Sequence, residues 1–357
     1  YDVLDTARAS LLQRVWNETV RPEVTTTIKN LCDLAEKNMD VLQVGRTHLQ
    51  DTSPVLFGGV LAGYAVRLAD RVQRCDLYFN DLRGKISGIV GTGASIDMVV
   101  GEGKSLKFEE RVLKELNLKP DNTATQITQK ERLADVGHGV VSLISVLGDF
   151  ANDMRMLYSS SIGEVSDRES AARLGGSSAD AGKNNPINWE NISRKVAVVE
   201  GGMRVLYEMI HSDFQRDLRG SVQARYQPGM MIAETYESFT RANKALKTLS
   251  VNEDRMDINL KSIRKNPTEA MVAILRGEGW VHSKLGVGHD FVRAMAKEAR
   301  SANRKLVCVC QEDKEFLELY QRLPVIKQCI LLGELERYVG SAKKRADVNI
   351  AYARSVN

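Results

Sequence analysis

The sequence is poor in residues that would anchor a chain in a membrane or cross-link it. Five cysteines, an odd number, are spread over 357 residues without a Cys-x-x-Cys pair. This usage argues against a disulfide framework and against a cysteine-based zinc site. There is also no apolar run of about 18 residues and no signal-peptide pattern, so we expect a cytoplasmic protein without membrane contacts.

An excess of charge of one sign is also lacking. Lysine and arginine number 50 and aspartate and glutamate 46, with both signs interspersed and a net charge of +4. Aromatic residues make up 6% of the chain, and no basic stripe contains them. Because nucleic-acid binding needs a concentrated basic surface, we expect no nucleic-acid partner.

Strand patterns are scarce, whereas helical patterns are long. Apolar residues recur every three or four positions over four stretches, namely 61–82, 133–157, 187–210 and 230–249. Each predicted helix would be about 30 Å long or longer. Alternation typical of strands is confined to residues 42–44 and 305–310.

The helical pattern changes at residues 250–259, where a polar stretch interrupts it. We therefore predict an all-α protein with two domains. Residues 1–250 would form an elongated central bundle of long helices, and residues 251–357 a smaller helical C-terminal domain.

The segment VGRTHLQDTSP, residues 44–54, crowds Arg46, Thr47 and His48 with other hydrogen-bonding groups before a long helix. A histidine here can titrate near neutral pH and act as a proton donor. The alternative is a purely structural cluster of turn and helix-cap residues.

The segment GGSSADAGKNNP, residues 175–186, consists mainly of small residues that cannot build a core. Its glycines allow backbone N–H groups to point at an anion, and Lys183 adds positive charge. Ser177 would be a useful base only if such donors stabilised its alkoxide. The alternative, a linker, is disfavoured because the segment runs through Pro186 directly into a predicted helix.

The segment SDFQRDLRGSVQARY, residues 212–226, contains Ser221 and Arg225 four positions apart. Arginine presents a bidentate fork to phosphate or carboxylate, so this pair could hold an anion. A solvated turn is the alternative interpretation.

Together these segments resemble the fumarase/aspartase superfamily of fumarate-releasing lyases, and most of all its adenylosuccinate lyase branch. The signature loop of that branch is Gly-Ser-Ser-x-Met-Pro-x-Lys-x-Asn-Pro, which residues 176–179, Lys183 and 185–186 match. Residues 45–48 and 216–225 also resemble family segments, in the same order along the chain.

The resemblance implies an anti β-elimination that converts adenylosuccinate into AMP and fumarate, and acts likewise on the succinylated precursor in purine synthesis. It implies Ser177 as the base and His48 as the acid or a contact to a substrate carboxylate. The positions that match substrate-binding residues are Arg46, Thr47, Gln126, Ser178, Lys183, Asn185, Ser221 and Arg225. It further implies no metal or organic cofactor, and a homotetramer in which three subunits build each active site.

Two features depart from the family pattern. Asp180 and Ala181 stand where the signature has Met-Pro, which adds a negative charge near a site for a dicarboxylate. The chain also begins at what resembles the end of a Thr-Ser-x-Asp motif of the family, whose N-terminal domain with further active-site histidines lies upstream of that motif. Either that domain was removed or is not resolved, or this homologue lacks it. The alternatives are an argininosuccinate lyase-, fumarase- or carboxymuconate cycloisomerase-like enzyme, or a non-catalytic homologue with a structural or binding role.

Overall fold

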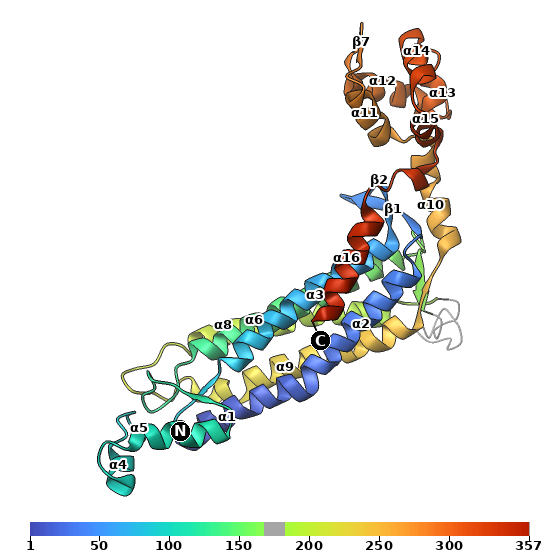
Figure 1. The fold of residues 1–357 in the computed structure, drawn as a ribbon. Coiled ribbons are helices and arrows are strands. Elements are labelled where there is room, and N and C mark those ends of the chain that lie inside the picture. Colours follow the sequence, from blue (N-terminus) through green and yellow to red (C-terminus); the bar gives the residue numbers. More distant parts are fainter. Residues whose placement is uncertain (168–182, 357) are drawn as a thin grey trace.

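The computed structural model describes residues 1–167 and 183–356. They form an elongated body of long helices with a smaller helical lobe at one end (Figure 1). Strands in the described residues occur only as short two-stranded pairs. The prediction of an all-α protein built on an elongated bundle is therefore confirmed.

The body begins with consecutive helical segments: α1 (Asp2–Val15), the π-helical η1 (Trp16–Val20) and α2 (Arg21–Lys37). An antiparallel hairpin follows, made of β1 (Leu42–Thr47) and β2 (Gln50–Leu56). The other long helices of the bundle are α3 (Phe57–Asn80), α6 (Glu131–Leu157), α8 (Ile187–Glu208) and α9 (Ser221–Thr248). Shorter elements lie between α3 and α6, namely β3 (Arg83–Gly84), α4 (Ala94–Val100), α5 (Ser105–Glu115) and β4 (Lys119–Pro120).

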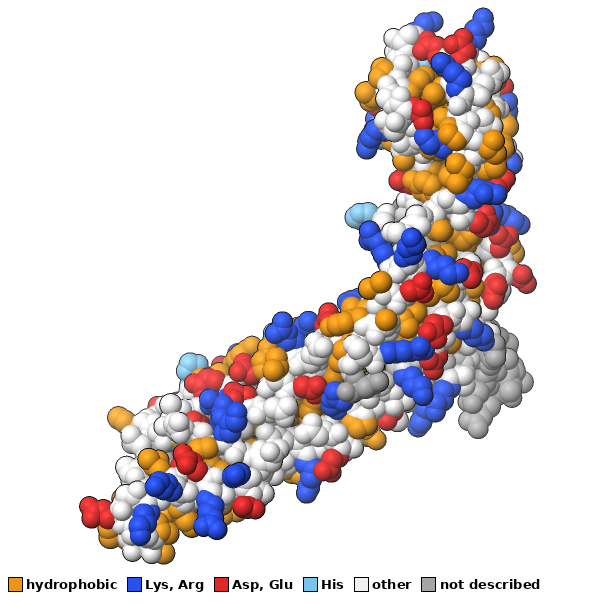
Figure 2. All heavy atoms as spheres, in the orientation of Figure 1, with side chains coloured by type: hydrophobic (Ala, Val, Ile, Leu, Met, Phe, Trp, Pro, Cys, Tyr) orange, Lys and Arg blue, Asp and Glu red, His pale blue; other side chains and the backbone are white. Residues whose placement is uncertain are grey.

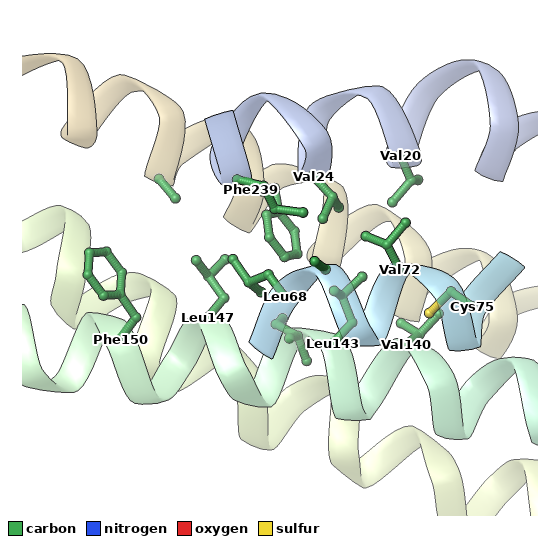
Figure 3. Close-up of a cluster of buried hydrophobic side chains, with 14 of the residues drawn as sticks. Val20, Val24, Leu68, Val72, Cys75, Val140, Leu143, Leu147, Phe150 and Phe239 are labelled. Atoms are coloured by element: carbon green, nitrogen blue, oxygen red, sulfur yellow. The ribbon is translucent and has the colours of Figure 1, made fainter. Parts of the chain in front are cut away.

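The core of the body lies where α2, α3, α6 and α9 meet (Figure 3). Leu68 of α3, Leu143 of α6 and Phe239 of α9 have no exposed surface. Burial of each such side chain contributes about 1.5–3 kcal/mol, so the apolar stripe of each helix directs its packing. Helix α6 is long and apolar enough to cross a membrane, but 67% of its most apolar window is buried inside the protein, as in a core helix.

The chain then enters the smaller lobe. Strand β5 (Val165–Asp167) pairs with β6 (Leu249–Val251), and α10 (Glu253–Lys265) leads outward from them. The lobe contains α11 (Thr268–Gly277), β7 (Val281–His282), β8 (Gly286–Val287), α12 (Gly288–Ser301), α13 (Leu306–Cys310), α14 (Lys314–Arg322), α15 (Val325–Leu332) and η2 (Leu335–Arg337). A second hydrophobic cluster forms the core of the lobe. In it the rings of Trp280 and Phe291 pack edge to face, with their centroids 4.9 Å apart.

The prediction of a strand at residues 305–310 is wrong, because α13 occupies this stretch. Leu306, Val307, Val309 and Cys310 are all buried in the second core. A short apolar run that is buried on several sides shows no clear period, so packing rather than β propensity decides its structure.

The last helix, α16 (Ala342–Ser355), returns to the body and packs on α2 and α3. Its residues Ala346, Ile350 and Ala353 belong to the first core. The chain thus crosses between body and lobe twice, and the division near residue 250 stays a prediction.

Candidate active site

The β1–β2 hairpin has the predicted acid at its tip. His48 and Leu49 connect the two strands, with φ angles of 53° and 60°. Two successive positive φ values are typical of a type I′ turn, whose twist matches that of a hairpin. Thr47 and His48 are both exposed, so the imidazole is accessible to a substrate.

Behind the tip, the hairpin is tied to a buried carboxylate. Each oxygen of Glu164 accepts two hydrogen bonds, Oε1 from Arg46 Nη2 (2.6 Å) and Asn259 Nδ2 (2.7 Å). Oε2 accepts from Arg46 Nη1 (3.1 Å) and Gln43 Nε2 (2.7 Å). We call these four residues the Glu164 cluster. Arg46 also pairs across the hairpin with Asp51 at 3.4 Å, so its guanidinium already has two protein carboxylates, and its predicted contact with substrate stays a prediction.

A second polar group lies where α9 begins. Arg216 donates to Gln126 Oε1 (2.8 Å), to Ser221 Oγ (3.2 Å) and to the hydroxyl of Tyr1, over whose ring it lies at 3.8 Å from the centroid. We call Tyr1, Gln126, Arg216 and Ser221 the α9 cluster. Two of its members, Gln126 and Ser221, were predicted to bind substrate, and the structure brings them together through Arg216.

The α9 cluster is suited to an anion. Within residues 1–167 and 183–356, Arg216 forms no ion pair within 4.0 Å, so its charge is not neutralised by a carboxylate. Ser221 is the first residue of α9, where unpaired backbone N–H groups and the helix dipole favour negative charge. Arg225 is exposed one turn further along the helix, on the same face as Ser221.

An ion cluster around the buried Asp5 lines the same cavity as Tyr1, Arg216 and Ser221 of the α9 cluster. Asp5 accepts from Arg8 (2.8 Å), Lys130 (2.7 Å) and the backbone N–H of Thr128 (3.0 Å). Burial alone would raise the pKa of the Asp5 carboxyl, but Lys130 and Arg8 outweigh it, and the pKa is lowered. The charged form of Asp5 is therefore fixed, and it anchors the first turn of α1 beside Tyr1.

Part of the predicted site lies outside the described residues. This applies to Ser177 and Ser178, and to Asp180 and Ala181. Among the predicted residues that follow, Lys183 is exposed and Asn185 is half-buried just before α8. Over the described part of the chain, no three His, Cys, Asp or Glu side chains are placed to hold a metal ion.

The two polar groups lie at opposite ends of the body (Figure 1). Helix α9 starts at Ser221 and ends beside β6, which pairs with β5 next to Glu164. Its 28 residues span about 42 Å at 1.5 Å per residue. Within one chain, His48 and Ser221 are therefore too far apart to contact the same small substrate.

Five residues of these clusters were not predicted as site residues, namely Tyr1, Gln43, Glu164, Arg216 and Asn259. Glu164 bonds to Arg46, which is 118 positions away, and Arg216 bonds to Tyr1, 215 positions away. No local spacing reveals such pairs. The only signal in the sequence was the density of arginine around Arg216.

Comparison with known proteins gives a consistent set of relatives. A family model described as Lyase matches residues 1–201. The adenylosuccinate lyase of Archaeoglobus fulgidus is 26% identical over 362 residues, covering 99% of this chain and 77% of that protein. The adenylosuccinate lyase of Pyrococcus horikoshii is 28% identical, and the alignment covers 99% of this chain and 76% of that protein. The adenylosuccinate lyase of Bacillus subtilis is 30% identical over a shorter stretch, which covers 72% of this chain and 58% of that protein.

Solved structures show the same fold. The 3-carboxy-cis,cis-muconate lactonizing enzyme from Pseudomonas putida matches with a TM-score of 0.81 at 20% identity, covering 99% of this chain and 76% of that one. The fumarate lyase from Mesorhizobium sp. BNC1 matches with a TM-score of 0.78 at 21% identity, covering 98% and 76%. At these identities the likeness concerns the fold alone.

Proposed function

The chain belongs to the lyase family, within the fumarase/aspartase superfamily, and from this membership we propose that it cleaves adenylosuccinate into AMP and fumarate. The succinylated precursor in purine synthesis would be a second substrate. The observation that carries this proposal is the alignment of 99% of the chain with two adenylosuccinate lyases. The hairpin and the α9 cluster support it, since the hairpin turn carries a possible proton donor, His48, and the α9 cluster offers a place for an anion.

In the proposed reaction a base removes a proton from the carbon beside a succinyl carboxylate. The electron pair forms the double bond of fumarate as the C–N bond breaks, and an acid protonates the departing nitrogen. Ser177 would be the base and His48 the acid. The exposed position of His48 on the hairpin turn supports that assignment.

The substrate carries two carboxylates and one phosphate, and each needs positive charge or donors. Lys183 and Asn185 would bind the succinyl carboxylates, and Thr47 and Ser178 would add hydroxyl donors. At the other end, Ser221, Arg225 and Gln126 would bind the nucleotide. Arg216 joins this group as a cation without a carboxylate partner in the described structure.

We infer that one active site uses parts of several copies of the chain, because His48 and Ser221 lie about one length of α9 apart. A homotetramer would place the hairpin of one copy beside the α9 cluster of another. Exposed apolar side chains on the bundle support such an assembly, among them Val198, Tyr207 and Val222. In Figure 2 hydrophobic side chains are interspersed with charged ones along the body.

Turnover tests the proposal directly. The protein is mixed with adenylosuccinate, and AMP and fumarate are measured. We expect turnover in the wild type and a loss of about 100-fold or more in His48→Asn, since a positioned acid contributes that much. Asparagine is chosen because it tolerates the positive φ at this position.

The matched control is His289→Asn, an exposed histidine of α12, which should keep wild-type activity. Fumarate release from argininosuccinate and from malate, and consumption of 3-carboxy-cis,cis-muconate, separate the other superfamily activities. Wild-type protein that releases no fumarate from adenylosuccinate contradicts the proposal. Inactivity towards all four substrates favours a non-catalytic homologue.

A further inference from the structure

The Glu164 carboxylate is fully buried, with 0% of its side chain exposed. A carboxylate has about four acceptor sites, and four donors from Gln43, Arg46 and Asn259 fill them. Removing one partner of a buried charge strongly destabilises the protein, because water cannot reach the charge to replace the lost interaction. We therefore expect the four hydrogen bonds of the Glu164 cluster to form and to break together.

Three segments that are distant in sequence meet at this carboxylate. Gln43 and Arg46 belong to β1 of the hairpin, and Asn259 belongs to α10, which leads to the smaller lobe. Glu164 itself immediately precedes β5, after which the chain continues towards the signature segment. The backbone carbonyl of Glu164 also accepts from the N–H of Asn252, at 2.9 Å.

The hairpin tip needs such support. His48 and Leu49 both adopt positive φ, a conformation that costs side chains other than glycine about 1–2 kcal/mol each and persists where the surroundings impose it. Arg46 is two residues from His48 and is held on one side by Glu164 and on the other by Asp51. The bidentate fork thus fixes β1 to Glu164, and the ion pair with Asp51 links β1 to β2 at the base of the turn.

We propose that Glu164 is a positioning residue for the lyase reaction, which acts through Arg46 to hold the turn that presents His48. The inference rests on the proposed function in one respect only, the assignment of His48 as the acid. Glu164 does not contact the substrate. Its effect is to keep the imidazole at one place relative to the departing nitrogen.

The test uses the full chain with Glu164→Gln, which keeps the shape but replaces one acceptor oxygen by a donor that faces other donors. Displacing a reacting group by about 1 Å costs on the order of 100-fold in rate, so we expect kcat to fall by about that factor while KM changes little. Amide hydrogen exchange over residues 42–56 should become about tenfold faster, while exchange in α3 stays unchanged. Glu164→Asp is the second variant, which keeps the charge but shortens the side chain.

The control is Glu36→Gln, which breaks another bidentate pair, that of Glu36 with Arg354. This pair lies between α2 and α16, so hairpin exchange and kcat should stay at the wild-type level. A rescue adds Leu49→Gly to Glu164→Gln. Glycine favours the type I′ turn on its own, so the double variant should recover much of the lost kcat.

The outcomes separate this inference from the proposed function. A wild type without turnover contradicts the proposed function, and the exchange measurement still decides whether Glu164 holds the hairpin. The inference is overturned if hairpin exchange in both Glu164 variants equals that of the wild type. It is also overturned if the wild type is active and Glu164→Gln changes only KM. The same holds if adding Leu49→Gly to Glu164→Gln restores no kcat.

Discussion

At the scale of single residues, two arginines differ in what surrounds their guanidinium groups. Arg46 is bonded to the buried Glu164 and paired with Asp51, so its charge is neutralised within the chain. Arg216 bonds to the neutral oxygens of Tyr1, Gln126 and Ser221. An arginine with neutral partners keeps its capacity for an anion, whereas one with two carboxylates stabilises the fold. The sequence around each arginine does not distinguish these roles.

Asp5 gives a prediction on acid stability. Its pKa is lowered in the folded protein because Lys130 and Arg8 outweigh the effect of burial. A depressed pKa means that the stabilisation is present above the unfolded pKa of about 4 and is lost as the pH falls through the folded value. Asp5→Asn should therefore lower the free energy of unfolding by about 3 kcal/mol at neutral pH, since it leaves Lys130 buried without its partner.

Urea unfolding at neutral pH and at successively lower pH measures this difference, which should shrink below about pH 4. Asp40→Asn is the control, because the pair of Asp40 with Lys343 is exposed and its loss should not move the unfolding midpoint. A difference for Asp5→Asn that stays constant down to low pH would show that the ion cluster does not depend on the charge of Asp5.

At the scale of elements, periodicity predicted the helices whose buried faces are apolar. The stretches 61–82, 133–157 and 187–210 correspond closely to α3, α6 and α8. Helix α9 begins at Ser221, well before the expected start near residue 230. Its first turns are polar and contain Pro228, so no apolar stripe marks them, and they contribute Ser221 to the α9 cluster.

The hairpin, like α9, extends beyond the residues whose pattern predicted it. Only residues 42–44 have an alternating pattern, yet β1 extends to Thr47 and pairs with β2. The rest of the hairpin is polar, and its geometry depends on the Glu164 cluster, whose members come from distant segments. The sequence thus predicted the residue types of the candidate site by resemblance. It could not predict which of them meet, because those contacts depend on tertiary packing.

Two glycines of α3 provide a matched pair. A Cβ on Gly58 would lie 2.3 Å from the carbonyl oxygen of Ala35 and 2.8 Å from Cα of Met39, both backbone atoms of the facing segment. Gly58→Ala should destabilise the protein by about 1–3 kcal/mol, because backbone must move. A Cβ on Gly63 has nothing within 4 Å, so Gly63→Ala should stabilise the helix by about 0.5–1 kcal/mol.

Chemical unfolding of the two variants under identical conditions measures this contrast. The sign of each effect is the decisive result. Two stabilised variants would mean that α2 and α3 do not approach as closely at Gly58 as the structure has it.

At the scale of the whole molecule, the elongated body separates the chemistry of the proposed site into two parts. The hairpin with His48 lies at one end, and the α9 cluster with Arg216 lies at the other (Figure 1). A compact chain could bring both to one cleft, but here the 28 residues of α9 hold them about 42 Å apart. The proposed activity therefore requires association, and it links catalysis to assembly.

That requirement predicts complementation between two inactive variants. His48→Asn removes the proposed acid, and Arg216→Met removes the cation of the α9 cluster, so each protein alone should have little activity. Mixed after dissociation and reassembled, they should regain activity, since about one site in four would combine an intact hairpin from one copy with an intact α9 cluster from another. Turnover of the mixture, compared with each variant treated in the same way, measures this.

A mixture of His48→Asn with itself, dissociated and reassembled, is the control for the treatment. Recovery is possible only if the two residues of one active site come from different copies, because a site within one chain would lack one residue in every molecule. Sedimentation of the reassembled mixture shows whether oligomers have formed. Oligomers that form without any recovery of turnover would place His48 and Arg216 in the same site of one chain, against the separation set by the 28 residues of α9.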